Sequence, residues 1–246
     1  MSRSKEHVQG VPARARIAFF DELRGFTVIS MVLFHASYDL AYLHGLDMPW
    51  FTQGPFQDIW RATISWTFLA LAGWMTSFSR NNVKRAAIYG LCALTVFAVT
   101  TIAAVDTPVN FGILACMAGS TALYAIASPG LRRIPSGVGA VACLMLFLLT
   151  LGIPRCTYPV EGLAWLGFPS PTFASGDYYP LIPFAFMYLA GSFGARWFQA
   201  VRGKRGYPLW TKATHAPALA WVGRKSLVIY LLHQPVLVGL LSILLG

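Results

Sequence analysis

The sequence predicts an all-α membrane protein, a polytopic transmembrane helix bundle of about seven spans with a cytoplasmic N-terminus. The chain has 246 residues, of which 56% are hydrophobic and only 11% are charged, and its mean hydropathy is +0.57. Apolar runs of membrane-spanning length recur along it, and short basic loops separate them. These observations argue against a soluble globular domain.

The predicted spans lie between turn signals and loops that contain proline and glycine. They cover residues 17–43, 58–79, 86–105, 110–127, 137–153, 179–198 and 221–245. We expect residues 1–15 to form a basic cytoplasmic tail and residues 16–246 to form one transmembrane domain. The first span is too long and too charged for a signal peptide, so we expect it to remain in the protein.

The charges of the loops predict the orientation. Sixteen of the 19 lysine and arginine residues lie before the first span, in the loops after the second and fourth spans, or between Arg196 and Lys225, in the loop before the last span and at the entry of that span. The other loops hold one basic residue and four acidic ones: Arg155, Asp47, Asp106, Glu161 and Asp177. Because basic loops stay in the cytoplasm, the N-terminus is predicted inside and Gly246 outside. The same clustering accounts for the net charge of +10 without nucleic acid as a partner.

One face of the first span carries charged side chains, which are costly inside a bilayer and therefore mark a bundle interior or a polar cavity. At about 100° per residue, Arg24 and His35 lie on one face, about 16 Å apart along the helix axis. Asp39 lies one turn beyond His35, and Asp21 lies nearly one turn before Arg24. The sequence thus predicts a polar track through the membrane.

Each part of this track has two interpretations. Asp21 and Arg24 form either an interfacial ion pair or an anion site, since arginine binds planar oxyanions with two hydrogen bonds. His35 is either a core histidine or a general base whose tautomer Asp39 fixes. We take His35 and Asp39 as candidate catalytic residues, and Arg24 and Asp21 as candidate cofactor-binding residues.

The last span presents a second polar face. Ser226, Tyr230 and His233 share it at helical spacing, and Pro235 frees a backbone carbonyl one turn earlier. Packing alone would also explain such a face. His233 and Tyr230 are candidate substrate-binding residues.

Three further residues are candidate substrate ligands. Arg61, one turn inside the outer end of the second span, binds either Asp39 or an acidic substrate, and the pair with Asp39 is favoured. Asn110 is either a ligand or the cap of a helix that begins at NFGIL. Asp177 precedes YYPLIPF and is either a ligand or part of an N-cap region.

No covalent or metal chemistry is indicated by the sequence. Cys92, Cys116 and Cys143 fall inside apolar segments and Cys156 is alone in a loop, so no disulfide framework is predicted. The sequence has no CxxC, no metal-ligand spacing, no GxSxG and no Walker loop. We therefore expect neither a metal cofactor nor a cysteine nucleophile.

Several motifs together resemble those of a known enzyme family. RIAFFDELRG followed by FHASYDL, then FGIL, SGDYYPLIP and SLVIYLLHQP, occur in this order across residues 16–235. The pattern is similar to that of the bacterial relatives of the heparan-alpha-glucosaminide N-acetyltransferase catalytic domain, which are related to the acyltransferase-three family. Two features differ. Ala115 stands where many relatives carry a histidine after FGIL, and animal lysosomal members have asparagine at the position of His35, which leaves His44 as the alternative base.

The resemblance implies a membrane acyltransferase that moves an acetyl or short acyl group from cytoplasmic acyl-CoA to an extracytoplasmic acceptor. Acetyl-CoA is then the co-substrate, a glycan or amino sugar the acceptor, and the plasma membrane the location. Arg24 and the basic loops would hold the CoA phosphates, while His35 deprotonates the acceptor.

Two other functions fit the same polar track. A transporter would use it as a path for protons or substrate, although seven spans without an internal repeat argue against an inverted-repeat carrier. A non-catalytic partner in surface-polymer assembly is the third interpretation. Consumption of acyl-CoA distinguishes the enzyme from both.

Overall fold

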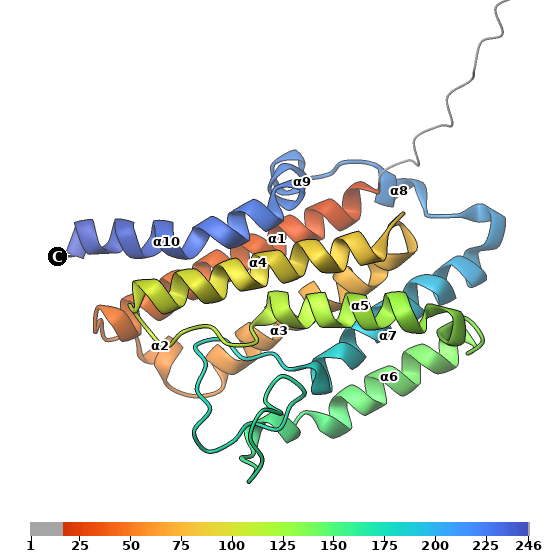
Figure 1. The fold of residues 1–246 in the computed structure, drawn as a ribbon. Helices are drawn as coiled ribbons and strands as arrows, with labels where there is room; N and C mark the ends of the chain where they lie inside the picture. Colours follow the sequence, from red (N-terminus) through yellow and green to blue (C-terminus); the bar gives the residue numbers. More distant parts are fainter. Residues whose placement is uncertain (1–16, 246) are drawn as a thin grey trace, which may run out of the picture.

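A computed structural model describes residues 17–245, and within this range the fold is all-α, with ten α-helices and no strand (Figure 1). Seven helices of at least 15 residues occupy the positions of the predicted spans: α1 (Ala18–Tyr38), α3 (Phe56–Trp74), α4 (Asn82–Ala103), α5 (Ile113–Leu131), α6 (Ser136–Thr150), α7 (Leu181–Arg202) and α10 (Ser226–Leu245). The predicted basic tail and Gly246 lie outside the described residues.

Shorter elements connect these helices. α1 continues as a π-helical turn at Asp39–Leu43. The short helices are α2 (Pro49–Thr52), α8 (Leu209–Lys212) and α9 (Pro217–Arg224).

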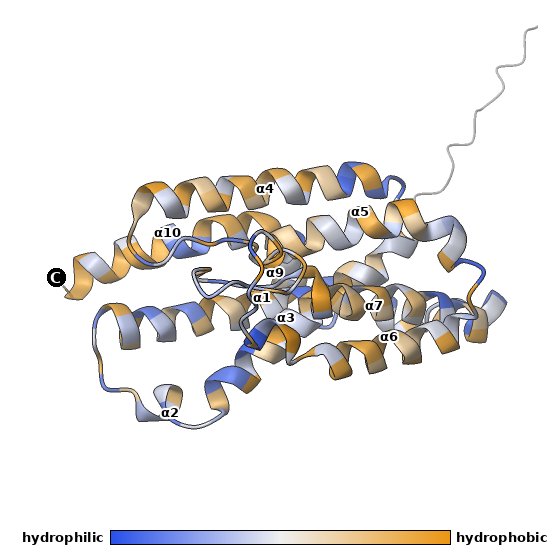
Figure 2. Cartoon of the chain, turned by 60° about the horizontal axis from the view of Figure 1, so that its bottom comes forward, coloured by the Kyte–Doolittle hydropathy of each residue, from blue (hydrophilic) through white to orange (hydrophobic). Residues whose placement is uncertain are grey.

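The exposed surfaces of the bundle are those of a multi-pass membrane protein. Within the described range, five helices are long and apolar enough to cross a membrane: α1 with its π turn, α4, α5, α6 with the turn that follows it, and α10. Figure 2 shows that α4, α6 and α10 are mainly hydrophobic along their length, and large side chains on them, such as Ile102 and Ile243, are exposed. α3 and α7 are similar in length but are not among these five, and they pack against each other.

The two ends of the bundle differ in charge. One end holds the loops at 75–81, 132–135 and 203–216; it carries Arg80, Arg132, Arg133, Lys204, Arg205 and Lys212, and we call it the basic end. The opposite end holds the loops at 44–55, 104–112 and 151–180, together with the end of α10 (Figure 1).

The prediction of a single helix over residues 221–245 is wrong. The chain breaks at Lys225, so that α9 and α10 are separate helices. α9 packs against α1 at Gly25 and Gly223, where a Cβ on either glycine would overlap backbone atoms of the other helix. The break gives α9 its own axis and permits this close crossing, which a continuous helix would not.

α5 also ends later than the predicted Ala127. It continues to Leu131 and accommodates Pro129 in its last turn. Arg196 of α7 donates hydrogen bonds to the carbonyl oxygens of Leu131 and Arg132 at 2.9 and 3.1 Å. These bonds satisfy carbonyl groups that a helix end leaves without partners.

α5 begins well inside the opposite end of the bundle. A Cβ on Gly90 of α4 would contact Ala118 of α5, so these two residues lie at the same height along the bundle. From there α4 continues to Ala103, whereas α5 begins at Ile113. α4 therefore extends about eight residues, or roughly 12 Å, beyond the start of α5, as Figure 1 shows.

Two non-helical loops, at 104–112 and 156–180, pair with each other beside the start of α5. The Tyr179 backbone N–H donates to the Phe111 carbonyl at 2.9 Å, and the Gly176 N–H donates to the Pro108 carbonyl at 3.2 Å. Non-helical backbone at membrane depth is tolerated only where protein buries it or where it lines a water-filled cavity. We call these segments the paired loops.

Candidate active site

The Asp21–Arg24 ion pair of α1 lies near the basic end. Arg24 Nη1 lies 3.0 Å from Asp21 Oδ1, and the Arg24 side chain is 22% exposed. This is the (i, i+3) ion pair that the sequence analysis gave as the alternative to an anion site. Its role in binding acetyl-CoA stays a prediction.

Glu22, between these two residues, links α1 to the segment before α9. Its Oε1 accepts hydrogen bonds from the backbone N–H groups of His215 and Ala216 at 2.7 and 2.9 Å. Together with the close crossing at Gly25, this contact fixes the start of α1, and with it the position of Arg24.

His35 and His233 meet where α1 and α10 pack together. Their ring centroids lie 4.8 Å apart. His233 Nδ1 lies 2.6 Å from the Tyr230 carbonyl oxygen, and the Tyr230 ring packs on His233 with centroids 5.6 Å apart. His233 Nε2 is buried and has no hydrogen-bond partner among the described residues.

The predicted contact between Asp39 and His35 is replaced by another. Gln234 Nε2 donates to the two carboxylate oxygens of Asp39 at 2.9 and 3.1 Å, and Asp39 is fully buried. Within the described residues no hydrogen bond joins Asp39 to His35. The π turn that begins at Asp39 and the approach of α10 explain the difference, because both change which side chains meet.

Arg61 likewise does not pair with Asp39, as the sequence analysis favoured. Its Nη2 lies 2.7 Å from Asp58 Oδ1, one turn earlier on α3, and both side chains are more than half exposed. A local (i, i+3) partner is available without any tertiary contact. The positive charge of Arg61 still acts on Asp177.

Asp177 belongs to the paired loops and lies at the N-terminus of α5. Its Oδ2 accepts a long hydrogen bond of 3.4 Å from the Ile113 backbone N–H, so it caps α5 rather than the helix that follows it in sequence. Burial raises its pKa to about 6, while the Ile113 N–H and the charge of Arg61 act to lower it. The carboxylate interacts electrostatically with Tyr179 and Tyr230. Since Tyr230 belongs to α10, Asp177 acts on a side chain of that helix.

Asn110 is not the cap of α5, because the N-cap residue is Gly112. Its side chain instead donates to the Ala174 carbonyl at 3.1 Å. Ser175 Oγ binds the backbone of Asn110 and also the Asp177 carbonyl, at 2.7 Å each. Asn110 and Ser175 therefore hold the paired loops together and fix the position of Asp177.

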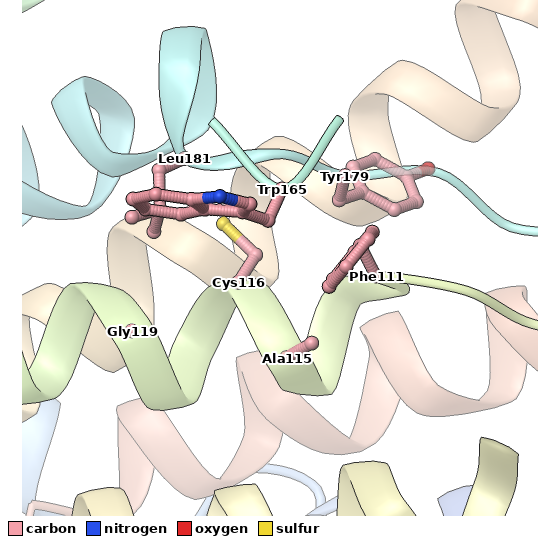
Figure 3. A pocket seen from close by; sticks show the side chains of 7 residues that line it. All are labelled: Phe111, Ala115, Cys116, Gly119, Trp165, Tyr179 and Leu181. Carbon is pink, nitrogen blue, oxygen red and sulfur yellow. The ribbon is translucent and has the colours of Figure 1, made fainter. Parts of the chain in front are cut away.

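A hollow of about 90 Å³ lies between α5 and the paired loops (Figure 3). Aromatic side chains form much of its wall; the lining residues are Phe111, Ala115, Cys116, Gly119, Trp165, Tyr179 and Leu181. In Figure 3 the Trp165 ring lies above Cys116, and Ala115 faces the same space. Flat aromatic surfaces of this kind pack well against other flat, apolar groups.

Several of these contacts were missed in the sequence analysis. Gln234 and Ser175 lie inside the motifs HQP and SGD, but no periodicity assigns them a partner. Trp165 lies in a long loop without any local signal. Only the packing of α10 against α1, and of one loop against the other, gives these residues their roles.

One known protein family matches the chain over most of its length. Residues 16–235 match the family described as "Heparan-alpha-glucosaminide N-acetyltransferase, catalytic". No curated protein and no solved structure gives a significant match to the chain. The match covers most of the 246 residues and spans every motif discussed above. The chain therefore belongs to the heparan-alpha-glucosaminide N-acetyltransferase catalytic family, and it is a membrane N-acetyltransferase that uses acetyl-CoA.

Proposed function

We propose that the enzyme transfers the acetyl group of cytoplasmic acetyl-CoA to the amino group of an extracytoplasmic amino sugar, as a free sugar or within a cell-surface glycan. In this proposal seven helices span the plasma membrane, and the basic end faces the cytoplasm. The substrate-binding residues are Asp177, Asn110, Tyr230 and His233, with Arg61 close by.

The observation that carries the proposal is a group of hydrogen-bond acceptors where α1 meets α10. His233 Nε2 and Gln234 Oε1 are buried without partners within the part of the chain that the structure describes. Beside them the Asp39 carboxylate is held by the single amide of Gln234. Buried acceptors are normally satisfied by donors, and an amino group brings more N–H donors than a hydroxyl brings O–H donors. This supports an amine as the acceptor.

The side assigned to acetyl-CoA follows from charge. The phosphates of CoA are anionic, and the positive field of the basic end raises the local concentration of anions. Arg24 lies just inside this end, about 16 Å along α1 from His35. An extended pantetheine arm spans a gap of this order, which would bring the thioester to the imidazole.

Direct transfer accounts for the chemistry. The amine nitrogen attacks the thioester carbonyl carbon, a C–N bond forms, and the C–S bond breaks. The proton lost by the nitrogen passes to His35 as general base, and the CoA thiolate then takes up a proton to leave as the thiol. No acyl-enzyme intermediate is needed.

Topology is tested first. Seven spans with a cytoplasmic N-terminus place the C-terminus outside and the loop at Gly203–Arg205 inside. Reporter fusions at these two positions are expected to score on opposite sides of the membrane. Reporters on the same side would show that the number of spans is not seven.

The assignment of substrates to the two ends is tested with paired variants. Arg24→Ala is expected to weaken acetyl-CoA binding about 10- to 100-fold and Asp177→Ala to weaken acceptor binding similarly, since hydrogen bonds to charged groups contribute about 1.5–3 kcal/mol. Each variant should leave the other substrate's affinity nearly unchanged. Binding is measured in sealed, oriented vesicles.

Arg155→Ala is the matched control, because it removes one positive charge from the opposite end. It should leave acetyl-CoA binding at the wild-type level. Acetyl-CoA that works only from the outer face, or an unchanged affinity in Arg24→Ala, would contradict the layout.

A further inference from the structure

We propose that His35 and His233 act as a pair that holds one proton during acetyl transfer, with His233 receiving the proton that His35 takes from the acceptor amine. This inference rests on the proposed function, which assigns His35 as the base. The two residues are almost 200 positions apart in sequence and are brought together by the packing of α1 against α10. Their rings lie 4.8 Å apart at an interplanar angle of 60°.

The hydrogen bond of His233 fixes its tautomer. Nδ1 lies 2.6 Å from the Tyr230 carbonyl oxygen, and a carbonyl oxygen can only accept, so Nδ1 carries the hydrogen. In the neutral ring Nε2 is then a lone-pair acceptor. This atom is buried and has no partner among the described residues. No hydrogen bond joins the two rings among the described residues, so the proton passes when a ring rotation brings a His35 nitrogen within hydrogen-bond distance of this acceptor.

The surroundings favour His233 over Asp39 as the partner of His35. Asp39 is held by Gln234, and His44 and Asp106 are the charged groups that act on it. The ring neighbours of His35 are Phe34 on α1 and His233 on α10. Tyr230 is the titratable group that packs on His233, and Asp177 and Tyr179 act on Tyr230 from the paired loops.

Only one proton fits on the pair. Two imidazolium cations at this separation, in a partly buried site, would repel each other strongly. Closely coupled groups of this kind take up protons as a pair, in separate macroscopic steps. The pair thus holds at most one proton, which it takes up once and releases once in each catalytic cycle.

The step balances without another reactant. The amine nitrogen forms its bond to the acetyl carbon and loses one proton to His35, and that proton moves to His233 Nε2. The C–S bond breaks, the pair returns the proton to the CoA thiolate, and both imidazoles are neutral again. The products are the N-acetylated amine and CoA thiol.

Nitrogen-15 NMR of histidine-labelled wild-type protein in nanodiscs tests the pair directly. We expect His233 to carry hydrogen on Nδ1 and none on Nε2, and the two rings to take up one proton well before a second as the pH falls. A hydrogen on His233 Nε2 in the neutral ring, or independent titration of the two rings, would overturn the proposal.

The kinetic test uses His233→Gln, which retains an amide able to bind the Tyr230 carbonyl but cannot accept a proton. We expect kcat to fall roughly 10²-fold, near the lower end of the range for a lost acid–base group, with the KM for acetyl-CoA unchanged. The proton inventory of kcat in H₂O–D₂O mixtures should change from curved to linear, which a purely structural role would not cause. Val236→Ala, an exposed position on the same helix, should retain the wild-type kcat.

Full activity of His233→Gln, or a proton inventory that the substitution leaves unchanged, would refute the relay. The NMR experiment needs neither the variant nor an acceptor. Failure of wild-type protein to acetylate any amine would therefore count against the proposed function alone, and the NMR result would still decide whether the pair exists.

Discussion

His35→Ala is expected to lower kcat about 10²- to 10⁴-fold, the range found when a general base is lost. The protein should stay folded, because the His35 ring is only half-buried and its ring neighbours, Phe34 and His233, come from helices held by many other contacts. Single-turnover transfer of labelled acetyl groups measures the loss. A thermal melt of the same sample verifies the fold.

His44→Ala is the matched control. His44 lies just after the π turn and acts electrostatically on Asp39, but it has no ring contact with His35 or His233 within the described residues. We expect at most a several-fold decrease in kcat. Near-normal turnover in His35→Ala combined with an inactive His44→Ala would assign the base to His44 instead.

Gly73→Ala and Gly191→Ala are expected to destabilise the protein strongly. Both glycines lie where α3 and α7 pack backbone to backbone: a Cβ on Gly73 would overlap the Tyr188 carbonyl oxygen, and one on Gly191 would overlap that of Ala70. Small residues permit such close packing between membrane helices. Because backbone atoms cannot rotate away as a side chain can, each substitution is expected to cost at least the 1–3 kcal/mol typical of overpacking. Thermal melts in detergent measure the effect.

Gly239→Ala on α10 is the control for these substitutions. Nothing lies within 4 Å of the position that its Cβ would take. In this helix alanine should be neutral or slightly stabilising, by about 0.5–1 kcal/mol. Equal melting temperatures for Gly73→Ala and Gly239→Ala would show that α3 and α7 do not pack as closely as the structure has them.

Much of the architecture could be predicted from the sequence, because each signal concerned is local. Long apolar runs predict the long helices, and the (i, i+3) spacing gives the Asp21–Arg24 ion pair, which the structure contains, as one of two interpretations. The ordered motifs predict the family that the comparison shows. Helix periodicity and membrane hydropathy act within one segment, so no tertiary information is needed.

The partners within the site could not be predicted in the same way. Asp39 follows His35 by one turn, and spacing alone favours a contact between them, but α10 brings Gln234 to the carboxylate instead. Similarly, Asp177 caps α5, a helix that begins 64 residues earlier in the chain. Such pairings depend on which helices pack together and on how far one helix is shifted along the other. No local pattern in a single sequence gives that shift.

The early start of α5 has an electrical consequence. α4 extends roughly 12 Å beyond it, and the space beside that stretch is occupied by non-helical polar backbone. In the seven-span arrangement proposed above, the insulating layer beside this stretch is thinner than the surrounding bilayer, so the transmembrane voltage falls over a shorter distance there. The energy of a unit charge changes by about 2.3 kcal/mol when the charge crosses a potential difference of 100 mV. We therefore expect the proton that passes from the amine to the His35–His233 pair and on to the CoA thiolate to move through a concentrated field, and acetylation to run at a rate that depends on the membrane potential.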